Sequence, residues 1–277
     1  DEDSLTERFH GQKECARVDI AVIRTPRISN FTDIAPLEAV DELDVSYVSN
    51  ISQFGDPDVV IIPGSKNTIS DLLWMRQNGL EGKILRHAAK GGIVFGICGG
   101  YQMLGQSISD PTGAEQKGTV RGMGLLPVTT VFEQEKRRTR VSGRFAKVGG
   151  ALAEMSGVCY EGYEIHMGRT VLSKGTVPLV YMEEEGEQRQ DGAQSDHVYG
   201  CYMHGIFDMS ETVKTFLAAV LRKKGIDPSK ITVRDRNAYK EEQYDRLASI
   251  VRENLNMEAV YKIIEKGNEA SCSLLSE

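Results

Sequence analysis

Cys98 is the residue of this sequence that is best placed for covalent chemistry. It lies in Gly96-Ile97-Cys98-Gly99-Gly100, directly after the β-branched apolar run 92–97. The form G-x-nucleophile-x-G between a strand and a helix is typical of a nucleophile elbow, a sharp turn with no room for side chains around the nucleophile. The helix that follows would point its N-terminus at the sulfur and favour the thiolate. The alternative is a buried core cysteine beside a glycine turn.

A thiol nucleophile needs a base, and His204 is the strongest candidate. It ends the predicted strand 197–205, and Gly205 opens the next loop. The carboxyl ends of strands are where active sites form in parallel α/β sheets. His166, in "YEIHMG", is the next candidate and is expected to contact a substrate. The other histidines are expected to be solvated or structural: His10, His87 and His197.

A second glycine turn predicts the other half of the site. The segment 59–72, "VVIIPGSKNTISDL", reads as a strand, a turn at Gly64 and Ser65, and a helix. Backbone N–H groups of these two residues, together with that of Gly99, could stabilise an oxyanion at the reacting carbon. An ordinary β–α turn capped by Asn67 or Thr68 is compatible with either interpretation.

The elements that must position these residues predict an α/β fold with a mostly parallel central sheet flanked by helices. Short apolar runs predict strands at 18–23, 44–48, 58–64 and 92–97. Helices are expected over 68–92, divided at Gly79, and from residue 100 to 108.

The pattern in the middle of the chain predicts antiparallel strands at 124–132, 139–145, 163–172, 177–182 and 197–205, with a polar loop at 183–196. A C-terminal helical extension should follow, with helices at 210–225, capped at Ser210, and 239–267, where Leu247, Ile250, Val251 and Leu255 form a stripe.

Composition excludes several classes of function. The 277 residues carry 33 basic and 40 acidic side chains, a net charge of −7, and no basic stripe, which argues against a nucleic-acid partner. No apolar run approaches the ~18 residues of a membrane span. The five scattered cysteines form no C-x-x-C pair, so no zinc ribbon, other metal site or disulfide framework is expected, and a reducing cytoplasm fits best. Cys201 is expected in the core.

Four segments together resemble the class I glutamine amidotransferase domain, a flavodoxin-like fold. They are "PGSKNTISDL", "GICGGYQMLG", "YEIHMGRT" and "CYMHGIFD", and the resemblance covers about residues 18–265. The last two segments and the helical end resemble the type found in cobyric acid synthase of cobalamin biosynthesis. Cobyrinate diamide and lipid II amidating enzymes share some of these motifs. The resemblance implies that Cys98 attacks the side-chain amide of glutamine, that His204 shuttles the proton, and that ammonia goes to a synthetase domain, which uses ATP to amidate corrin carboxylates.

The chain departs from many class I members at one position. Ile206 stands where they carry a glutamate that orients the catalytic histidine. The resemblance implies that the cobyric acid synthase type lacks this glutamate, so a Cys–His dyad is expected and the orienting group is open between Asp208 and Glu164. Glu164 is also a candidate contact to the substrate.

An arginine is expected to hold the α-carboxylate of glutamine, since its guanidinium binds both oxygens. Residues 137–140 contain Arg137, Arg138 and Arg140 between two predicted strands, and Arg140 is our candidate. A solvated turn is the alternative.

Amidation of a carboxylate also needs ATP, and the chain has no G-x-x-x-x-G-K-[ST] loop. We therefore expect no cofactor in this chain. ATP and Mg²⁺ are expected to bind to a synthetase domain that is either upstream or a separate chain.

The expected organisation is a linker at 1–16, the amidotransferase domain at 17–209, and a helical extension with a mobile tail at 210–277. The expected partners are glutamine, that synthetase domain and a corrin acceptor, with no membrane and no nucleic acid. Three other hypotheses remain: an amidotransferase for another acceptor, of the cobyrinate diamide or lipid II type, a Cys–His hydrolase of another amide or ester on the same fold, and a non-catalytic domain.

Overall fold

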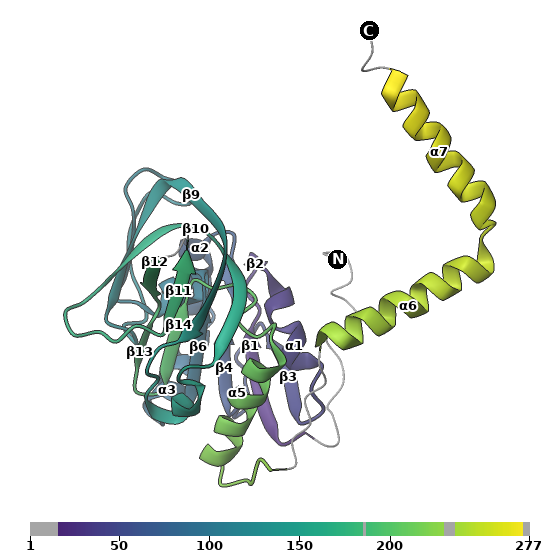
Figure 1. Ribbon diagram of the computed structural model, residues 1–277. Helices are drawn as coiled ribbons and strands as arrows, with labels where there is room; N and C mark the ends of the chain where they lie inside the picture. The colour runs from purple at the N-terminus through teal and green to yellow at the C-terminus, as the bar shows by residue number, and fades with distance from the viewer. Residues whose placement is uncertain (1–15, 185–186, 230–235, 274–277) are drawn as a thin grey trace. The chain divides into compact units, whose positions relative to one another are not determined.

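Six strands form the sheet that positions the predicted site (Figure 1). The computed structural model describes residues 16–184, 187–229 and 236–273. The strand order is β13-β14-β6-β4-β1-β3. Neighbours are parallel except for β13 and β14. The bounds are β1 (Val18–Ile23), β3 (Leu43–Val48), β4 (Val59–Ile62), β6 (Ile93–Ile97), β13 (Ala193–Ser195) and β14 (Val198–Cys201).

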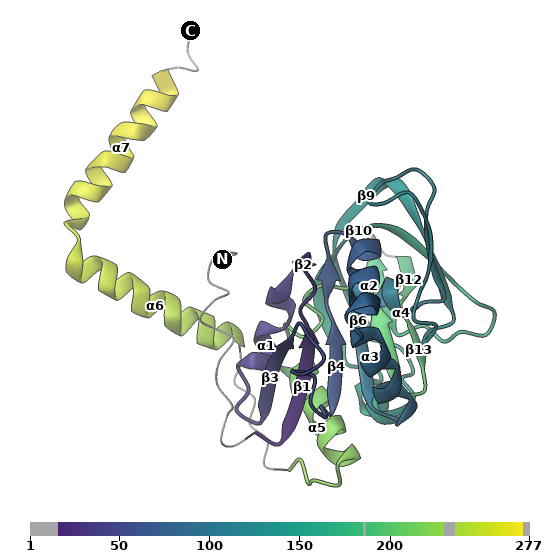
Figure 2. The ribbon, with the colours of Figure 1, turned by 180° about the vertical axis from the view of Figure 1, so that it is seen from behind.

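Helices cover both faces of this sheet, which explains why β4 and β6 are buried at every position. Figure 1 shows α5 in front of the sheet, and Figure 2 shows α2 and α3 in front of the opposite face. The bounds are α1 (Ala35–Glu38), α2 (Thr68–Gln77), α3 (Leu80–Ala89), α4 (Gly99–Leu104) and α5 (Ser210–Lys223). Gly79, with a φ of 77°, divides α2 from α3 as predicted. The predicted cap at Ser210 is wrong, because Met209 precedes the helix and makes no side-chain cap.

A second sheet, in the order β12-β11-β9-β7-β8 with β10 beside β9, is built from the middle of the chain. The bounds are β7 (Ser107–Asp110), β8 (Gly118–Arg121), β9 (Val128–Phe145), β10 (Cys159–Leu172), β11 (Val180–Glu184) and β12 (Glu187–Asp191). The helix predicted to reach residue 108 ends at Leu104, and β7 follows. Residues 137–140 lie inside β9, not in a turn, because they pair with β10. An isolated bridge between Tyr163 and His204 joins β10 to the segment after β14.

Short elements complete the edge where the site forms. They are β2 (Ile28–Ser29), η2 (Phe31–Asp33), β5 (Gly64–Ser65) and, further along, η3 (Gly150–Met155). β2 and β5 pair antiparallel, so the loop after β1 is tied to the turn after β4. Residues 24–43, for which the sequence pattern predicts no element, carry β2 and η2 at the edge of the site.

The chain divides into two compact units, with the division between Val233 and Arg234. The expected end of the amidotransferase domain, at residue 209, lies before this division. The first unit also includes α5, because the buried face of this helix packs against α1 and β1. The second unit contains α6 (Arg236–Asn254) and α7 (Met257–Ser273). Its predicted apolar stripe is largely exposed, with Leu247 and Leu255 more than half accessible. Most of the expected linker and the last residues of the tail lie outside the described residues. No helix among the described residues is long and apolar enough to cross a membrane.

Candidate active site

Cys98 lies in the sharp turn that the sequence predicted, between the end of β6 and the start of α4. Its φ of 51° and ψ of −107° are strained values for a residue with a side chain. Its backbone N–H donates to the carbonyl of Cys201 at 2.9 Å, which ties the elbow to β14. A Cβ atom on Gly100 would lie 1.9 Å from the carbonyl oxygen of Ile62. The glycine is therefore required by the close approach of α4 to β4.

His204 lies after β14 and is fully buried beside the elbow. Its Nδ1 lies 2.7 Å from Oδ2 of Asp33, and the other oxygen of Asp33 accepts the N–H of Gly205 at 2.9 Å. Asp33 is itself only 2% exposed. A carboxylate with two fixed contacts of this kind holds the imidazole in one orientation and one tautomer. Asp33 is therefore the group that orients His204, and neither Glu164 nor Asp208 occupies that place.

Asp33 was not predicted from the sequence because the loop that carries it has no regular pattern. One signal was available: Asn30 and Asp33 come soon after β1, and the carboxyl ends of parallel strands meet at one edge. Asn30 has a left-handed φ of 51°, which turns the chain into η2. Its side-chain amide lies 3.1 Å from Nε2 of His204. The ring of Tyr163 stacks on the imidazole with centroids 5.2 Å apart.

Electrostatics favour the imidazolium form of His204. Burial by itself lowers the pKa of this histidine, but contact with Asp33 and with Cys98 outweighs burial and raises the pKa to about 10. The imidazolium lies beside the Cys98 sulfur, an arrangement found in other Cys–His pairs. The Cys98 thiol also donates to the carbonyl of Ile165 on β10, at 3.8 Å.

The three residues predicted for an oxyanion hole lie together at this edge. A Cβ atom on Gly64 would lie 3.2 Å from the His204 ring. A Cβ atom on Gly99 would lie 3.0 Å from the backbone nitrogen of Ser65. The two turns thus approach each other beside Cys98, and a side chain at Gly99 would crowd Ser65 and Thr68.

A carboxylate that the sequence analysis did not single out lies next to this pair of turns. Glu115 accepts the backbone N–H of Thr68 at 2.6 Å, and its other oxygen lies 3.3 Å from the hydroxyl of Thr68. That hydroxyl donates to Gln102 of α4 and would contact a side chain on Gly99. The loop is fixed by Asp110, which accepts four backbone N–H groups from residues 113–116. Glu115 therefore brings a negative charge close to the elbow.

The remaining predicted residues divide into two groups. Arg140 is exposed on β9 and is paired directly with Tyr163, so both side chains lie on the same face of the ribbon. His166 and Glu164 lie on the other face of β10. His166 stacks on Tyr202 with centroids 3.7 Å apart, and Glu164 is buried against Arg189 at 2.5 Å. These two side chains therefore lie on the face of β10 away from Tyr163 and His204, and their contact with a substrate stays a prediction.

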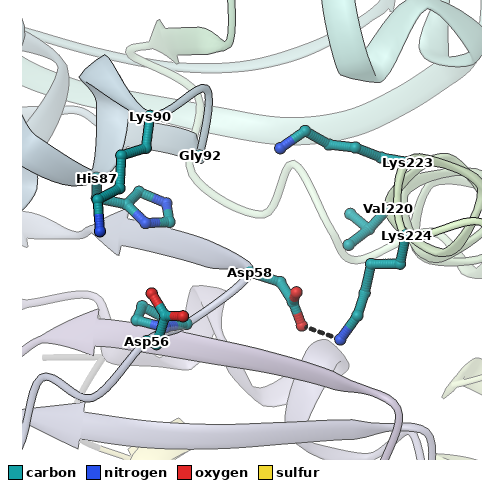
Figure 3. Close-up of a pocket in the computed structure, with 9 residues that line it drawn as sticks. Asp56, Asp58, His87, Lys90, Gly92, Val220, Lys223 and Lys224 are labelled. Atoms are coloured by element: carbon teal, nitrogen blue, oxygen red, sulfur yellow. Dashed lines mark hydrogen bonds and ion pairs between the residues drawn. The ribbon is translucent and has the colours of Figure 1, made fainter.

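A pocket of about 240 Å³ lies at the opposite ends of the strands from His204, where β4 and β6 begin (Figure 3). Lys224 forms an ion pair with Asp58 there at 2.6 Å. His87 lines it and is almost buried, with Nε2 3.1 Å from the carbonyl of Ile93, so the prediction of a solvated histidine is wrong. None of the residues expected to do chemistry lies in this pocket.

No group of three or more His, Cys, Asp or Glu among the described residues is arranged to hold a metal ion.

Comparison with known proteins agrees with this geometry. The family model for the CobB/CobQ-like glutamine amidotransferase domain matches residues 19–212. A protein of Ruminiclostridium cellulolyticum named cobyric acid synthase is 52% identical over 273 residues, covering 97% of this chain and 53% of that protein. Its namesake in Lachnoclostridium phytofermentans is 44% identical over 277 residues, covering 96% and 54%. The chain thus spans about half the length of these curated relatives.

Solved structures show the same fold at low sequence identity. The PurLQS structure from Thermotoga maritima matches with a TM-score of 0.55 and 17% identity, over 75% of this chain and 99% of that chain. A structure titled glutamine amidotransferase matches with a TM-score of 0.52 and 15% identity, over the same shares.

Proposed function

Because the chain belongs to the CobB/CobQ-like glutamine amidotransferase domain family, we propose that it hydrolyses glutamine and supplies the ammonia for an ATP-dependent amidation. The acceptor we propose is a set of corrin carboxylates, as in the cobyric acid synthases that it resembles, and ATP and Mg²⁺ would bind to the other half of such a protein. The observation that carries the proposal is the contact between Asp33 and His204, which lie beside a cysteine in a strained elbow. The location we propose is a reducing cytoplasm, since the five cysteines are scattered and form no C-x-x-C pair.

The proposed chemistry begins with the Cys98 thiolate, which attacks the side-chain amide carbon of glutamine and forms a C–S bond. The developing oxyanion accepts N–H groups from Gly64, Ser65 and Gly99. His204 donates its proton to the amide nitrogen, the C–N bond breaks, and ammonia leaves. Water, deprotonated by the same imidazole, then hydrolyses the thioester to glutamate and the free thiol.

We propose that two charged side chains recognise the amino-acid end of glutamine. Arg140 shares a face of the β9–β10 ribbon with Tyr163, which stacks on His204, and this supports our proposal that its guanidinium binds the α-carboxylate. Glu115 contacts Thr68, which lies beside Gly99 of the elbow, and we propose that it binds the α-ammonium. Its pKa is raised, chiefly by burial, and a bound cation would lower it again.

Active-site alkylation tests the proposal directly. The full-length natural protein and this chain are incubated with 6-diazo-5-oxo-norleucine, a reactive glutamine analogue, and intact mass and peptide mapping locate the adduct. We expect one adduct, on Cys98, protection by glutamine, and no adduct in Cys98→Ala. Cys159 is exposed and serves as an internal control for non-specific alkylation. Equal labelling of Cys159, or no labelling of Cys98 in the full-length protein, would contradict a glutamine site at the elbow.

A further inference from the structure

The second compact unit carries most of the large apolar side chains that are exposed in the described part of the chain. There are eleven such side chains, and seven of them belong to α6, α7 and the turn between these helices. The seven are Tyr244, Leu247, Ile250, Leu255, Tyr261, Ile263 and Ile264. The first unit is several times longer, so this concentration of exposed apolar surface is a property of the two helices.

Apolar residues form one stripe along each of these helices. In α6 and the turn after it, they recur at intervals of three, four and four residues. In α7 the intervals are three, one and three residues. The stripes consist of Tyr244, Leu247, Val251 and Leu255 in the first case, and of Met257, Val260, Tyr261 and Ile264 in the second. Spacing of this kind places each set on one side of its helix, and such a side normally packs on another apolar surface.

The opposite sides of the helices are polar and already have partners within their own helix. Lys262 forms an ion pair with Glu258 one turn away in α7, at 2.7 Å. The hydroxyl of Ser249 donates to the carbonyl of Asp245 in α6, at 2.9 Å. The polar sides are therefore suited to water, and the apolar stripes are the sides that need cover.

Helices of this length do not account for their own stability. α6 has 19 residues and α7 has 17. An isolated helix of that length is marginal in water, because most helical stability in proteins comes from the packing of an apolar face. The second unit leaves its stripes largely exposed. A surface outside this unit must therefore cover them.

The first unit offers no apolar surface of matching size among its described residues. Its exposed large apolar side chains are Ile51, Val131, Val171 and Val177. Ile51 follows β3, whereas Val131 and Val171 belong to the β9–β10 ribbon, so the four do not form one patch that could accept both stripes.

The comparisons place the second unit outside the amidotransferase domain but inside the longer proteins. The family model ends at residue 212, before the second unit begins. The relatives from Ruminiclostridium cellulolyticum and Lachnoclostridium phytofermentans match 97% and 96% of this chain, so their matched regions include most of the second unit. The same matches cover only 53% and 54% of those proteins. The two helices thus occur together with a further half that this chain does not contain.

The charges of the second unit favour a protein partner. Residues 244–265 carry three basic and four acidic side chains. A helix that lies on a membrane surface typically has an excess of Lys and Arg on its polar side, and a nucleic-acid partner also needs a basic patch. A helix with an apolar stripe and balanced charges instead fits an apolar groove of a protein.

We propose that the second unit docks through its apolar stripes into an apolar groove on the other half of the full-length protein. That half is the one that the curated relatives have in addition to the matched region, and in the proposed function it binds ATP. The docking goes beyond the proposed function, because it requires that half to be present but does not require glutamine hydrolysis. It ties the two halves together by a contact that is separate from the proposed active site.

Hydrogen–deuterium exchange in the full-length natural protein tests whether the stripes are covered. We expect slow exchange of the amides of residues 244–264. Leu247→Glu should speed this exchange at least about tenfold, because it places a charge in the apolar contact. Ser249→Glu adds the same charge to the polar side of the same helix, so it is the matched control and should leave the exchange unchanged. Fast exchange across residues 244–264 in the wild type, or equal rates in the two variants, would overturn the docking.

A photo-cross-linker identifies the surface that covers the stripes. The amino acid p-benzoylphenylalanine replaces Leu247 in the full-length natural protein, and peptide mapping after irradiation locates the linked segment. We expect a link within one molecule to a segment outside residues 1–277. A link inside residues 1–277 would place the stripes against this chain itself, and a covalent dimer would place them against a second copy; either result would overturn the proposal.

The proposed function is tested separately in the same preparations. The reaction of Cys98 with 6-diazo-5-oxo-norleucine reports on the glutamine site and not on the second unit. A Cys98 adduct without the expected cross-link would overturn the docking alone. The expected cross-link without a Cys98 adduct would leave the docking intact and contradict the glutamine site.

Discussion

At the scale of single residues, the contact between Asp33 and His204 turns an expected Cys–His dyad into a three-residue arrangement. The carboxylate binds both the imidazole and the N–H of Gly205, so it fixes the ring and the loop that carries it. An orienting carboxylate typically contributes several orders of magnitude to catalysis, because without it the imidazole adopts the wrong tautomer. Asp33 reaches the histidine from η2, in the loop after β1, and not from the segment that follows the histidine.

Asp33→Asn should therefore lower kcat for glutamine hydrolysis by about 10²- to 10⁴-fold while KM changes little. The amide can still bond to Gly205 but cannot stabilise an imidazolium. Steady-state glutamate release measures the effect. Asp44→Asn, on the neighbouring β3, is the control and should leave kcat unaffected. A kcat in Asp33→Asn near that of the wild type would show that the carboxylate has no part in the reaction.

The same contact predicts a pH dependence of stability. The pKa of His204 is raised from its ordinary 6.5 to about 10, so the native state holds this proton more tightly than the unfolded chain. The stabilisation is fully present below pH 6.5 and is lost as the pH rises toward 10. Asp33→Asn should consequently reduce the free energy of unfolding more at pH 6 than at pH 9, as measured by urea denaturation. A larger loss at pH 9 would reverse the assigned sign.

Arg140→Ala should raise KM for glutamine about tenfold or more with little change in kcat, because the lost hydrogen bonds bind substrate and transition state alike. Arg144→Ala, further along the same strand and also exposed, is the matched control. An unchanged KM in Arg140→Ala would remove this residue from the glutamine site.

At the scale of elements, the close packing of α4 on β4 explains the glycines around Cys98. Helix α4 begins at the residue after the cysteine, and its first turn lies against the backbone of Ile62. No side chain fits between them. The strained backbone of Cys98 is held by this packing and by the hydrogen bond to Cys201.

Gly100→Ala should consequently lower Tm strongly or prevent folding, since its Cβ would lie 1.9 Å from the carbonyl oxygen of Ile62. Gly82→Ala is the matched control, because Gly82 lies inside α3 and its Cβ would have room, at 3.7 Å from the nearest atom, in Arg86. That substitution should stabilise the chain by up to about 1 kcal/mol through helix propensity. Thermal unfolding of both variants measures the contrast, and equal Tm values would contradict it.

At the scale of the whole molecule, the two compact units imply that the first folds without the second. The proposed site and the β9–β10 ribbon belong entirely to the first unit, as does α5. A chain that ends at residue 229 should therefore keep a cooperative thermal transition within a few degrees of the wild type. Circular dichroism and calorimetry measure it. Loss of the transition would show that the second unit is needed for folding.

The sequence by itself determined the parallel sheet, the elbow at Cys98 and the identity of His204 as its neighbour. Each depends on local signals, namely apolar runs that must be buried on both faces, glycines where backbones approach, and a histidine at a strand end. The continuous strand β9, the burial of His87 and the placement of Arg140 opposite Tyr163 depended on pairings between distant segments. Only the tertiary structure decided that Asp33, 171 residues before His204, orients its ring. The loop that carries Asp33 has no periodic pattern, so its position is fixed by where β1 and β14 end in the sheet and not by its own sequence.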